Sequence, residues 1–188
     1  MARQSYQNIS STTLFNFTDT YDYLVENLLQ GFYCGDVYEK LPFRNIGYKV
    51  PMVCFCDIPL GAIKHHLLWY GNYAIGIKRE YARTYKVNPV WYIHKDNPVI
   101  QKMIKSKDKI ELESTPILPY LKQFLGYQKD SNGIKKEKKF YDEMEWRYIP
   151  EGEDYKAVLI KGVHNSKAAI IVDKRITRMP LEIDRIEK

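Results

Sequence analysis

The stretch FYDEMEWRYIP (residues 140–150) has the composition of a buried strand but places charged side chains at alternate positions, Glu143, Glu145 and Arg147. Successive side chains of a strand point to opposite faces, so these three residues are expected on one face. The other face would be apolar, formed by Met144, Trp146 and Tyr148. The charged face either borders a ligand cleft or is the solvated side of an edge strand. In the second case Glu145 and Arg147 form a surface ion pair worth about 0–1 kcal/mol.

A single domain covering residues 1–188 is expected, because a chain of 188 residues can bury a core without metal or disulfide support. Its 45% hydrophobic and 28% charged residues are typical of a globular protein in water. Residues 1–12 are polar and are expected to be flexible. The 16 tyrosines suit the walls of a polar cleft, since a tyrosine packs through its ring and reaches a polar partner through its hydroxyl. They suit a core equally well.

The chain is mildly basic, with 29 Lys and Arg residues against 23 acidic residues and a formal net charge of +6. This excess is compatible with nucleic acid or a phosphate-bearing ligand. Nucleic-acid binding is only weakly supported, because no recognised module or concentrated basic helix is present. The densest basic run, KKEKK at 135–139, predicts a solvated loop, with a phosphate-binding patch as the alternative.

The three cysteines, Cys34, Cys54 and Cys56, argue against a disulfide framework and for a location in a reducing cytoplasm. Cys54 and Cys56 would point the same way from a strand, either as a metal-binding pair or as small buried side chains. Because no second Cys or His pair with zinc spacing follows, no metal is expected. No apolar run reaches the length of about 18 residues that a membrane span needs, and no signal peptide is evident, so no membrane partner is expected.

The order of apolar runs and breakers predicts an α+β fold with a mixed, mostly antiparallel, split sheet and flanking helices. Strands are expected at 13–18, 51–58, 73–82, 88–95, 143–150, 155–160 and 168–176. Helices are expected at 18–31, 59–71, 97–106 and 114–126. The first helix would be capped by Thr18 or Asp19, would end at Gly31, and would bury a stripe formed by Tyr23, Leu24, Leu28 and Leu29. The second would begin at Pro59 and end at Gly71.

Common nucleotide and hydrolase signatures are absent, since the sequence has no Walker loop, glycine-rich dinucleotide fingerprint, HExxH or G-x-S-x-G motif. Any chemistry must therefore use dispersed residues that the fold brings together. His66 would meet Tyr70 on one helix face, where it either touches a ligand or packs. Asp57 would either line a cleft or cap the helix that follows, and we favour the cap.

Four blocks of the sequence carry a resemblance to a known family. They are LFNFT (14–18), the stretch from PMVCFCDIPL to YGNYAIGIKREY (51–81), NPVWYI (88–93) and FYDEMEWRYIP (140–150). Together they resemble the AbiGi-type abortive-infection proteins, which are bacterial anti-phage components of about this length. The resemblance runs from the first expected strand to Pro150. It implies a protein–protein role, because the family is regarded as the antitoxin partner of a nucleotidyltransferase-like toxin.

The order of these blocks is also similar to the ADP-ribosyltransferase plan, which implies NAD as cofactor. In that plan a carboxylate on a late strand holds the nicotinamide ribose. It stabilises the positive charge that develops on the ribose carbon as nicotinamide leaves. The resemblance assigns this catalytic role to Glu145, with Glu143 as the residue that orients the substrate. Arg147 would pair with one of these glutamates or with a phosphate.

The resemblance also implies cofactor-binding roles for Asn16 and Thr18 on the first strand and for Tyr70 and Tyr73 as stacking residues. The family pattern has His where this chain has Asn16. An Asn can hydrogen-bond a ribose but cannot carry a proton or a positive charge. Two functions are therefore expected as alternatives. One is an anti-phage protein that binds NAD and transfers ADP-ribose to a macromolecule, and the other is a non-catalytic antitoxin or sensor that binds a toxin or phage component.

Overall fold

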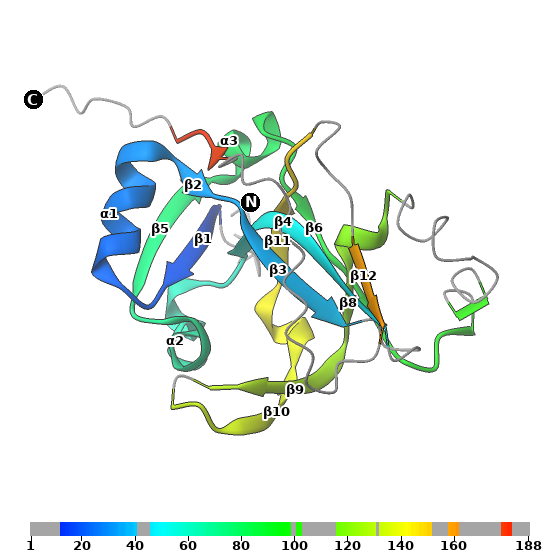
Figure 1. Cartoon of the computed structure of the whole chain (residues 1–188). Helices are drawn as coiled ribbons and strands as arrows, with labels where there is room; N and C mark the ends of the chain where they lie inside the picture. Colours follow the sequence, from blue (N-terminus) through cyan, green and yellow to red (C-terminus); the bar gives the residue numbers. More distant parts are fainter. Residues whose placement is uncertain are drawn as a thin grey trace, which may run out of the picture.

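The computed structural model describes residues 12–40, 46–98, 101–102, 116–130, 132–151, 158–161 and 178–181. They form a mixed α+β fold in which most strand pairs are antiparallel, as the sequence predicts (Figure 1). The strands are β1 (Thr13–Thr18), β2 (Phe32–Tyr33), β3 (Gly35–Lys40), β4 (Ile46–Cys56), β5 (Tyr73–Lys78), β6 (Asn88–Pro89), β7 (Trp91–Ile93), β8 (Leu121–Gln123), β9 (Leu125–Lys129), β10 (Lys135–Lys139), β11 (Glu145–Tyr148), β12 (Val158–Lys161) and β13 (Arg178–Met179). The helices are α1 (Tyr21–Gln30), α2 (Lys64–Tyr70) and α3 (Arg79–Thr84), with 3-10 turns η1 (Leu60–Ala62), η2 (Leu118–Tyr120) and η3 (Phe140–Glu143).

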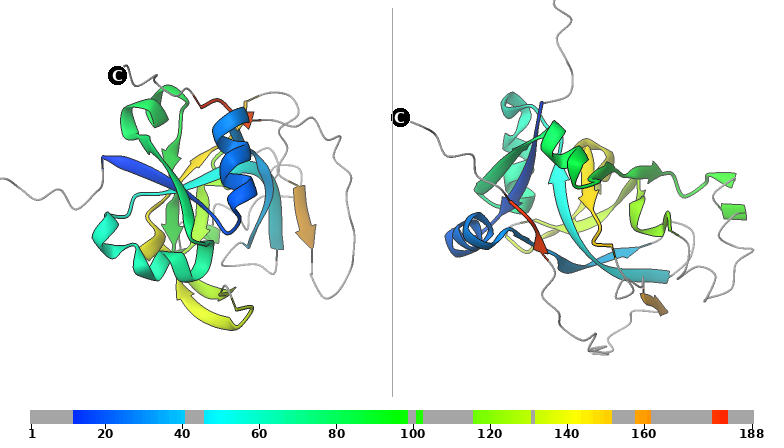
Figure 2. Two further views of the ribbon diagram at one scale, coloured as in Figure 1. Left: turned by 90° about the vertical axis from the view of Figure 1, so that its left-hand side faces the viewer. Right: turned by 90° about the horizontal axis from the view of Figure 1, so that it is seen from above.

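The long strand β4 organises the main sheet, whose order is β5-β1-β4-β11-β6. Its first half pairs with β3 and β12, and its second half pairs with β11 and touches β1. Smaller sheets are formed by β9 with β10, by β2 with β13, and by the parallel pair β7 and β8. The hairpin β9–β10 lies below α2 and η3 in Figure 1, and Figure 2 shows the same arrangement from two further sides. The main sheet is thus split along β4, whose two halves pair with different strands.

Strand β4 supplies side chains to two hydrophobic cores, one on each of its faces. Tyr48, Val50 and Met52 pack with Leu118 and Leu121 on one face. On the opposite face Val53 and Phe55 pack with a second cluster, which includes Leu14, Phe32, Ile75 and Ile77. Because side chains of a strand alternate, Cys54 lies on the same face as Tyr48 and Met52. Beyond the first core, this face of β4 continues to Cys54 and Cys56, which line the cavity described below.

Helix α1 follows the expectation at its ends but only in part along its face. The hydroxyl of Thr20, next to the expected caps Thr18 and Asp19, accepts a hydrogen bond of 3.3 Å from the Tyr23 amide. The helix ends before Gly31, whose φ of 83° suits glycine. The expected stripe is covered only in part: Leu24 is half-buried against the second core cluster, but Tyr23 and Leu29 are 59% and 79% exposed.

Of the region expected as a helix at 114–126, the described residues from Pro116 onward contain the turn η2, strand β8 and the start of strand β9. Leu118 opens the 3-10 turn with Pro119 as its second residue, and Leu121–Gln123 then pairs with β7. Because side chains alternate along a strand, Lys122 lies on the opposite face from Leu121. The predicted helix did not indicate this arrangement. Strand pairing with a distant segment outweighed local helix propensity here.

Other expected boundaries also moved. The segment expected as one strand at 73–82 is strand β5 followed by helix α3, and the one at 88–95 is split into β6 and β7. Helix α2 begins at Lys64 after the turn η1 and not at Pro59, although it ends at Gly71 as expected. The strand expected at 168–176, residues 1–11 and most of the helix expected at 97–106 lie outside the described residues.

The EWR segment is a strand only from Glu145 onward. Phe140–Glu143 forms the turn η3, and Met144 adopts a left-handed conformation with a φ of 44°. Glu145 and Arg147 then alternate with Trp146 and Tyr148 as expected.

Of the described helices, none is long and apolar enough to cross a bilayer.

Candidate functional site

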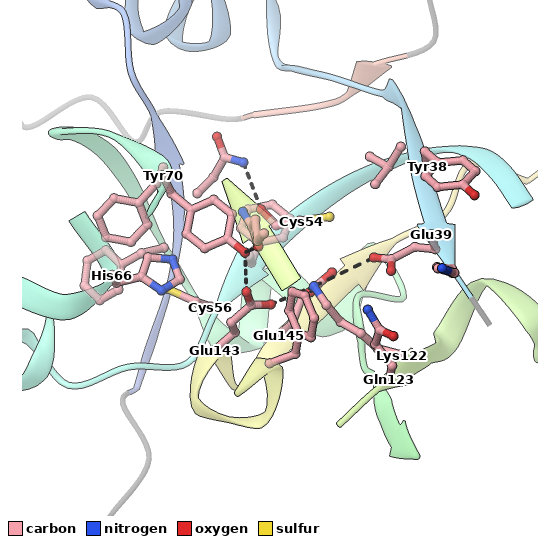
Figure 3. Close-up of a pocket in the computed structure, with 18 of the residues that line it drawn as sticks. Tyr38, Glu39, Cys54, Cys56, His66, Tyr70, Lys122, Gln123, Glu143 and Glu145 are labelled. Atoms are coloured by element: carbon pink, nitrogen blue, oxygen red, sulfur yellow. Dashed lines mark hydrogen bonds and ion pairs between the residues drawn. The ribbon is translucent and has the colours of Figure 1, made fainter. Parts of the chain in front are cut away.

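A cavity of about 420 Å³ opens on the face of the sheet that carries Cys54 (Figure 3). Its walls come from β1, β3, β4, α2 and the β8–β9 region, and its floor comes from η3 and the start of β11. Asn16, Glu143 and Glu145 all line it. Two of the three charged residues of the EWR segment, Glu143 and Glu145, therefore face a cavity. The alternative of a solvated edge with a surface ion pair is wrong.

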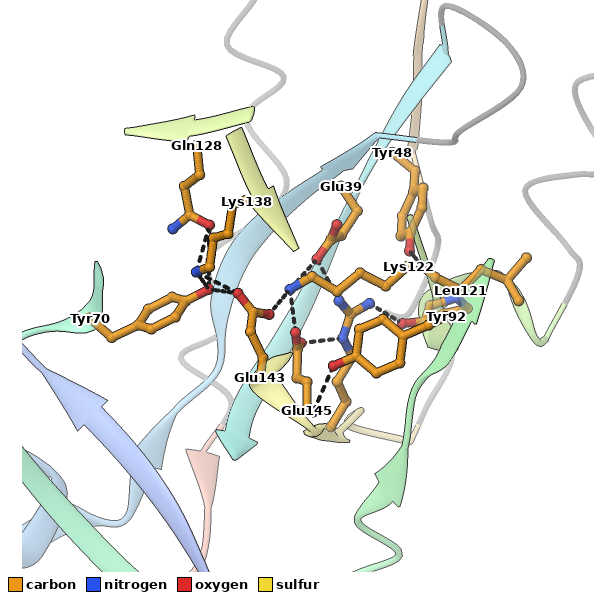
Figure 4. Close-up of polar contacts among 12 residues, drawn as sticks. Glu39, Tyr48, Tyr70, Tyr92, Leu121, Lys122, Gln128, Lys138, Glu143 and Glu145 are labelled. Atoms are coloured by element: carbon orange, nitrogen blue, oxygen red, sulfur yellow. Dashed lines mark hydrogen bonds and ion pairs between the residues drawn. The ribbon is translucent and has the colours of Figure 1, made fainter. Parts of the chain in front are cut away.

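Lys122, on β8, lines the cavity and is the cation at which the contacts of three glutamates meet (Figure 4). Its Nζ lies 2.6 Å from Glu143 Oε2, contacts Glu145 Oε2, and lies 3.7 Å from Glu39 Oε1. The lysine is 7% exposed, and the glutamates that it joins come from three separate elements. An ammonium group has three protons to donate, so one buried lysine can hold several carboxylates together.

Arg147 is fully buried, and its guanidinium binds three groups of the protein itself. Its Nε donates to Glu145 Oε1 at 2.6 Å, its Nη1 donates to the Pro119 carbonyl at 2.5 Å, and its Nη2 contacts Glu39 Oε1. A planar guanidinium suits such divided binding. The pairing of Arg147 with a glutamate is confirmed. The alternative of a phosphate ligand has little room, because Arg147 does not line the cavity.

Lys138 extends the same network toward α2. Its Nζ lies 2.6 Å from Glu143 Oε1, donates to the Tyr70 hydroxyl at 2.8 Å and donates to Gln128 Oε1 at 3.1 Å. The Tyr70 hydroxyl also donates to Glu143 Oε1. These contacts tie the hairpin β9–β10 to α2 and η3. Lys138 belongs to the KKEKK run, which was expected to be a solvated loop. The run is strand β10 and not a loop; its other four residues are exposed as expected, but Lys138 is 7% exposed.

The charges of the network balance. Its three carboxylates belong to Glu39, Glu143 and Glu145, and its three cations belong to Lys122, Lys138 and Arg147. Burial opposes ionisation of Glu145, but Arg147 and Lys122 outweigh it and hold the pKa of this carboxyl well below its usual value. Burial also disfavours the charged form of Lys122, yet the surrounding glutamates raise the pKa of this lysine.

A column of aromatic rings forms one wall of the cavity. The ring centroid of His66 lies 4.7 Å from that of Phe17 and 4.5 Å from that of Tyr70. Burial, together with the positive charge of Lys138, lowers the pKa of His66 to about 4, so the imidazole is neutral at pH 7. His66 therefore both packs in a ring stack and lines the cavity. The two alternatives for this residue are compatible.

Comparison with known proteins adds the family. Residues 33–179 match the profile of the family described as "Putative abortive phage resistance protein AbiGi, antitoxin". The chain belongs to the AbiGi family. A protein named "Abortive phage resistance protein AbiGi" from Lactococcus lactis subsp. cremoris is 27% identical, with 61% of this chain and 56% of that relative covered. The chain thus spans little more than half the length of this relative. No solved structure matches.

The AbiGi resemblance is confirmed, but its limits differ from those expected. The family match begins at Tyr33 and so leaves out the LFNFT block with Asn16. It continues past Pro150 to Met179, through a region that we expected the resemblance not to cover. The difference between Asn16 and the histidine of the family pattern therefore lies outside the matched residues.

The cavity gathers some of the site residues that the sequence predicts for this AbiGi chain and not others. Asn16, Tyr70, Glu143 and Glu145 line it, and the Nδ2 of Asn16 donates to the Cys54 carbonyl at 2.9 Å. Thr18 and Tyr73 lie outside the lining: Thr18 accepts a weak bond of 3.5 Å from the Thr20 amide, and Tyr73 packs edge-on against Tyr21. The Asn16 and Tyr70 placements agree with the cleft hypothesis.

Asp57 does not cap a helix, contrary to our preferred interpretation. The N-cap residue of the turn η1 is Pro59 and that of the helix α2 is Ile63, and neither makes a side-chain cap hydrogen bond. Asp57 is buried, and its Oδ2 lies 2.6 Å from Arg79 Nη2. It also does not line the cavity. A buried carboxylate needs a partner, and here Arg79 provides one.

Cys54 and Cys56 both line the cavity as free thiols. Within the described part of the chain, no group of three or more His, Cys, Asp and Glu side chains is arranged to hold a metal ion. Burial raises the pKa of Cys56 to about 12 and that of Cys54 well above its usual value. Cys56 is buried and Cys54 is half-buried, so both act as small packed side chains beside the glutamates of the cavity.

Three charged residues of the site escaped the sequence interpretation: Glu39, Lys122 and Lys138. Glu39 lies in a strand that was not expected, Lys122 in a segment expected as a helix, and Lys138 in a run expected as a loop. No signal in the sequence pointed to Glu39. The surplus of one acid on the EWR face, where Glu143 and Glu145 stand against Arg147, pointed only to further cations, because buried charges require partners. The sequence does not say which of the 29 Lys and Arg residues supply them.

Proposed function

We propose that this AbiGi chain acts in abortive phage resistance as a non-catalytic antitoxin-type module, in the cytoplasm, which restrains a toxin or binds a phage component. The family description supports the antitoxin role. The main observation behind this proposal concerns Glu143 and Glu145, the two glutamates that a transferase would use. Both are already bound by donors of this chain.

All four carboxylate oxygens of Glu143 and Glu145 have partners. Glu145 Oε1 accepts from Arg147 and Oε2 contacts Lys122. Glu143 Oε1 binds Lys138 and Tyr70, and Oε2 binds Lys122. A catalytic carboxylate must direct its charge at the reacting atoms, where the charge stabilises the transition state more than the ground state. These carboxylates direct theirs at buried cations, so the network supports a structural role.

Asn16 supports the same proposal. A neutral amide cannot supply the proton or positive charge of the histidine in the family pattern. Its Nδ2 is also used on the Cys54 carbonyl at 2.9 Å. This opening strand therefore offers the cavity an amide and no ionisable group.

A second candidate is an ADP-ribosyltransferase-like enzyme that binds NAD and transfers ADP-ribose to a macromolecule. One observation favours it: Asn16, Glu143 and Glu145 share one cavity, as the resemblance to that fold requires. In this candidate a ligand would have to draw Glu145 away from Lys122 and Arg147. Such a displacement leaves buried charges without partners, which costs several kcal/mol.

A growth assay tests the proposal. The product of the neighbouring gene is expressed alone and together with this chain. We expect growth arrest in the first case and growth in the second. Growth arrest by this chain alone, or no restoration of growth by it, would contradict the antitoxin role.

An activity assay separates the two candidates. The purified chain is incubated with labelled NAD and an extract of phage-infected cells, beside the Glu145→Gln and Asn16→His variants. We expect no transfer of label and no release of nicotinamide from any of the three proteins. Activity of the wild type that disappears in Glu145→Gln would establish the enzyme. Because Glu145→Gln removes a buried countercharge, its melting curve is compared with that of the wild type first.

A further inference from the structure

We propose that the cavity binds an uncharged, planar heteroaromatic ligand of nucleoside size, stacked on its ring wall and held at its edges by side-chain amides. The ligand would be bound but not chemically converted. This proposal is independent of toxin restraint, since it depends only on the lining of the cavity. The protein would then have a small-molecule binding site in addition to the surface that binds a protein partner.

The shape of the site suits a ring. A volume of about 420 Å³ falls within the range of roughly 300–1,000 Å³ that small-molecule sites occupy. Phe17, His66 and Tyr70 form a continuous row of rings that are tilted against one another by 55° and 32°, with centroid distances of 4.7 Å and 4.5 Å. Tyr38 and Phe140 also line the cavity. Aromatic side chains bind flat rings by stacking, a contact worth about 1–3 kcal/mol for a nucleic-acid base.

The polar groups of the lining suit the edges of a heteroaromatic ring. Asn16, Gln123 and Gln128 line the cavity, and an amide side chain offers both a donor and an acceptor. Asn16 uses its Nδ2 on the Cys54 carbonyl and leaves its carbonyl oxygen as an acceptor. Gln128 uses its Oε1 on Lys138 and leaves its NH₂ group as a donor. Donors and acceptors in such pairs recognise base edges in other proteins.

The electrostatics of the site select against charge. The ammonium of Lys122 is shared among three glutamates, and Glu143 is shared between two lysines. A phosphate or an ammonium group that reached these buried side chains would have to break one of their ion pairs to find a countercharge there, and the other cation of the lining, Lys40, is exposed. The neighbouring imidazole of His66 is neutral at pH 7. A neutral ligand leaves every pair intact.

Titration calorimetry of the full chain with adenosine, guanosine, cytidine and uridine tests the proposal. We expect at least one nucleoside to bind, and we expect its 5′-monophosphate to bind at least tenfold more weakly. NAD, which carries phosphates, is expected to behave like the monophosphates. His66→Ala removes the middle ring of the stack and is expected to weaken binding at least tenfold. His65→Ala is the matched control, because His65 is exposed and does not line the cavity, and it is expected to bind like the wild type.

Three results would overturn the proposal. The first is the absence of binding by any of the four nucleosides at concentrations up to about 1 mM. The second is tighter binding of a monophosphate than of its nucleoside, which would show that the site accepts charge. The third is unchanged binding in a folded His66→Ala protein. Should His66→Ala not fold, Tyr38→Ala replaces it, since Tyr38 lies at the rim and is 43% exposed.

Discussion

Lys122 Nζ and Glu143 Oε2 lie 2.6 Å apart in the interior of the protein, although 21 positions separate the two residues in the sequence. The same ammonium reaches Glu145 on β11 and Glu39 on β3. Each charge would be costly to bury alone, so the residues stabilise one another only when all their elements are in place. The network thus makes the site depend on the complete fold.

Lys122→Met is expected to destabilise the protein by about 3–5 kcal/mol, because it leaves the buried glutamates with one cation fewer. Urea unfolding at pH 7 measures the effect. Lys129→Met, at an exposed position of the neighbouring strand, is the control and is expected to change stability by less than about 0.5 kcal/mol. Equal effects of the two variants would show that the network contributes nothing to stability.

The double variant Lys122→Met, Glu143→Gln tests whether the two residues act as a pair. Removing Glu143 together with its lysine removes the uncompensated charge that the single variant creates. We therefore expect the double variant to lose less stability than the sum of the two single variants. Additive effects in urea unfolding would contradict the contact between Lys122 and Glu143.

The stability of the protein is expected to fall as the pH is lowered from about 6.5 toward 4. Burial lowers the pKa of His66 to about 4 in the folded protein, whereas the unfolded chain binds a proton near pH 6.5. Between these values the unfolded state binds more protons, so acid favours unfolding. The loss from this one residue is about 2 kcal/mol at pH 5, relative to neutral pH.

His66→Phe keeps a ring in the stack but removes the titration. Urea unfolding at pH 7.5 and pH 5 is expected to show a smaller loss of stability for this variant than for the wild type. His65→Phe should keep the full pH dependence of the wild type. The low pKa of Glu145 adds a separate loss that begins only near the ordinary glutamate pKa of about 4.3, so it does not mask the histidine.

The three cysteines are expected to resist alkylation in the folded protein. Burial raises the pKa of Cys34 to about 11, that of Cys56 to about 12, and that of Cys54 well above its usual value. Since the thiolate is the nucleophile, iodoacetamide at pH 8 should modify each of them at least about a hundredfold more slowly than in urea-unfolded protein. Mass spectrometry measures the rates. Rapid modification of one native cysteine would place that thiol at the surface.

Gly71→Ala is expected to destabilise the protein by about 2 kcal/mol or more. Gly71 has a φ of 99°, and a Cβ atom there would overlap the backbone of Thr18 and Asp19. Gly61→Ala is the matched control, because a Cβ atom at Gly61 meets no atom within 4 Å, and it should change stability by less than about 0.5 kcal/mol. Thermal melting distinguishes the two variants. A stable Gly71→Ala protein would contradict the close approach of α2 and β1.

Much of the fold was predictable where the signal is local. Strand β1 and the end of α1 at Gly31 were predicted, as was the end of α2 at Gly71, because alternation and glycine conformations act within a few residues. The segment 114–126 was not, since β8 exists through its pairing with β7, some 30 residues away. Of the expected apolar stripe of α1, Leu24 packs against the core, whereas Tyr23, Leu28 and Leu29 are exposed. Amphipathic spacing predicts a face but does not say whether anything covers it.

The sequence by itself determined that Glu145 and Arg147 share one face of a strand, opposite Trp146 and Tyr148, because side-chain direction in a strand depends only on the local backbone. Tertiary structure alone decided that this face is turned inward and balanced by cations from β8 and β10. Buried charges require countercharges, but the identity of the countercharge depends on which distant segments meet. Those meetings are fixed by long-range strand pairing and core packing, which no local pattern specifies.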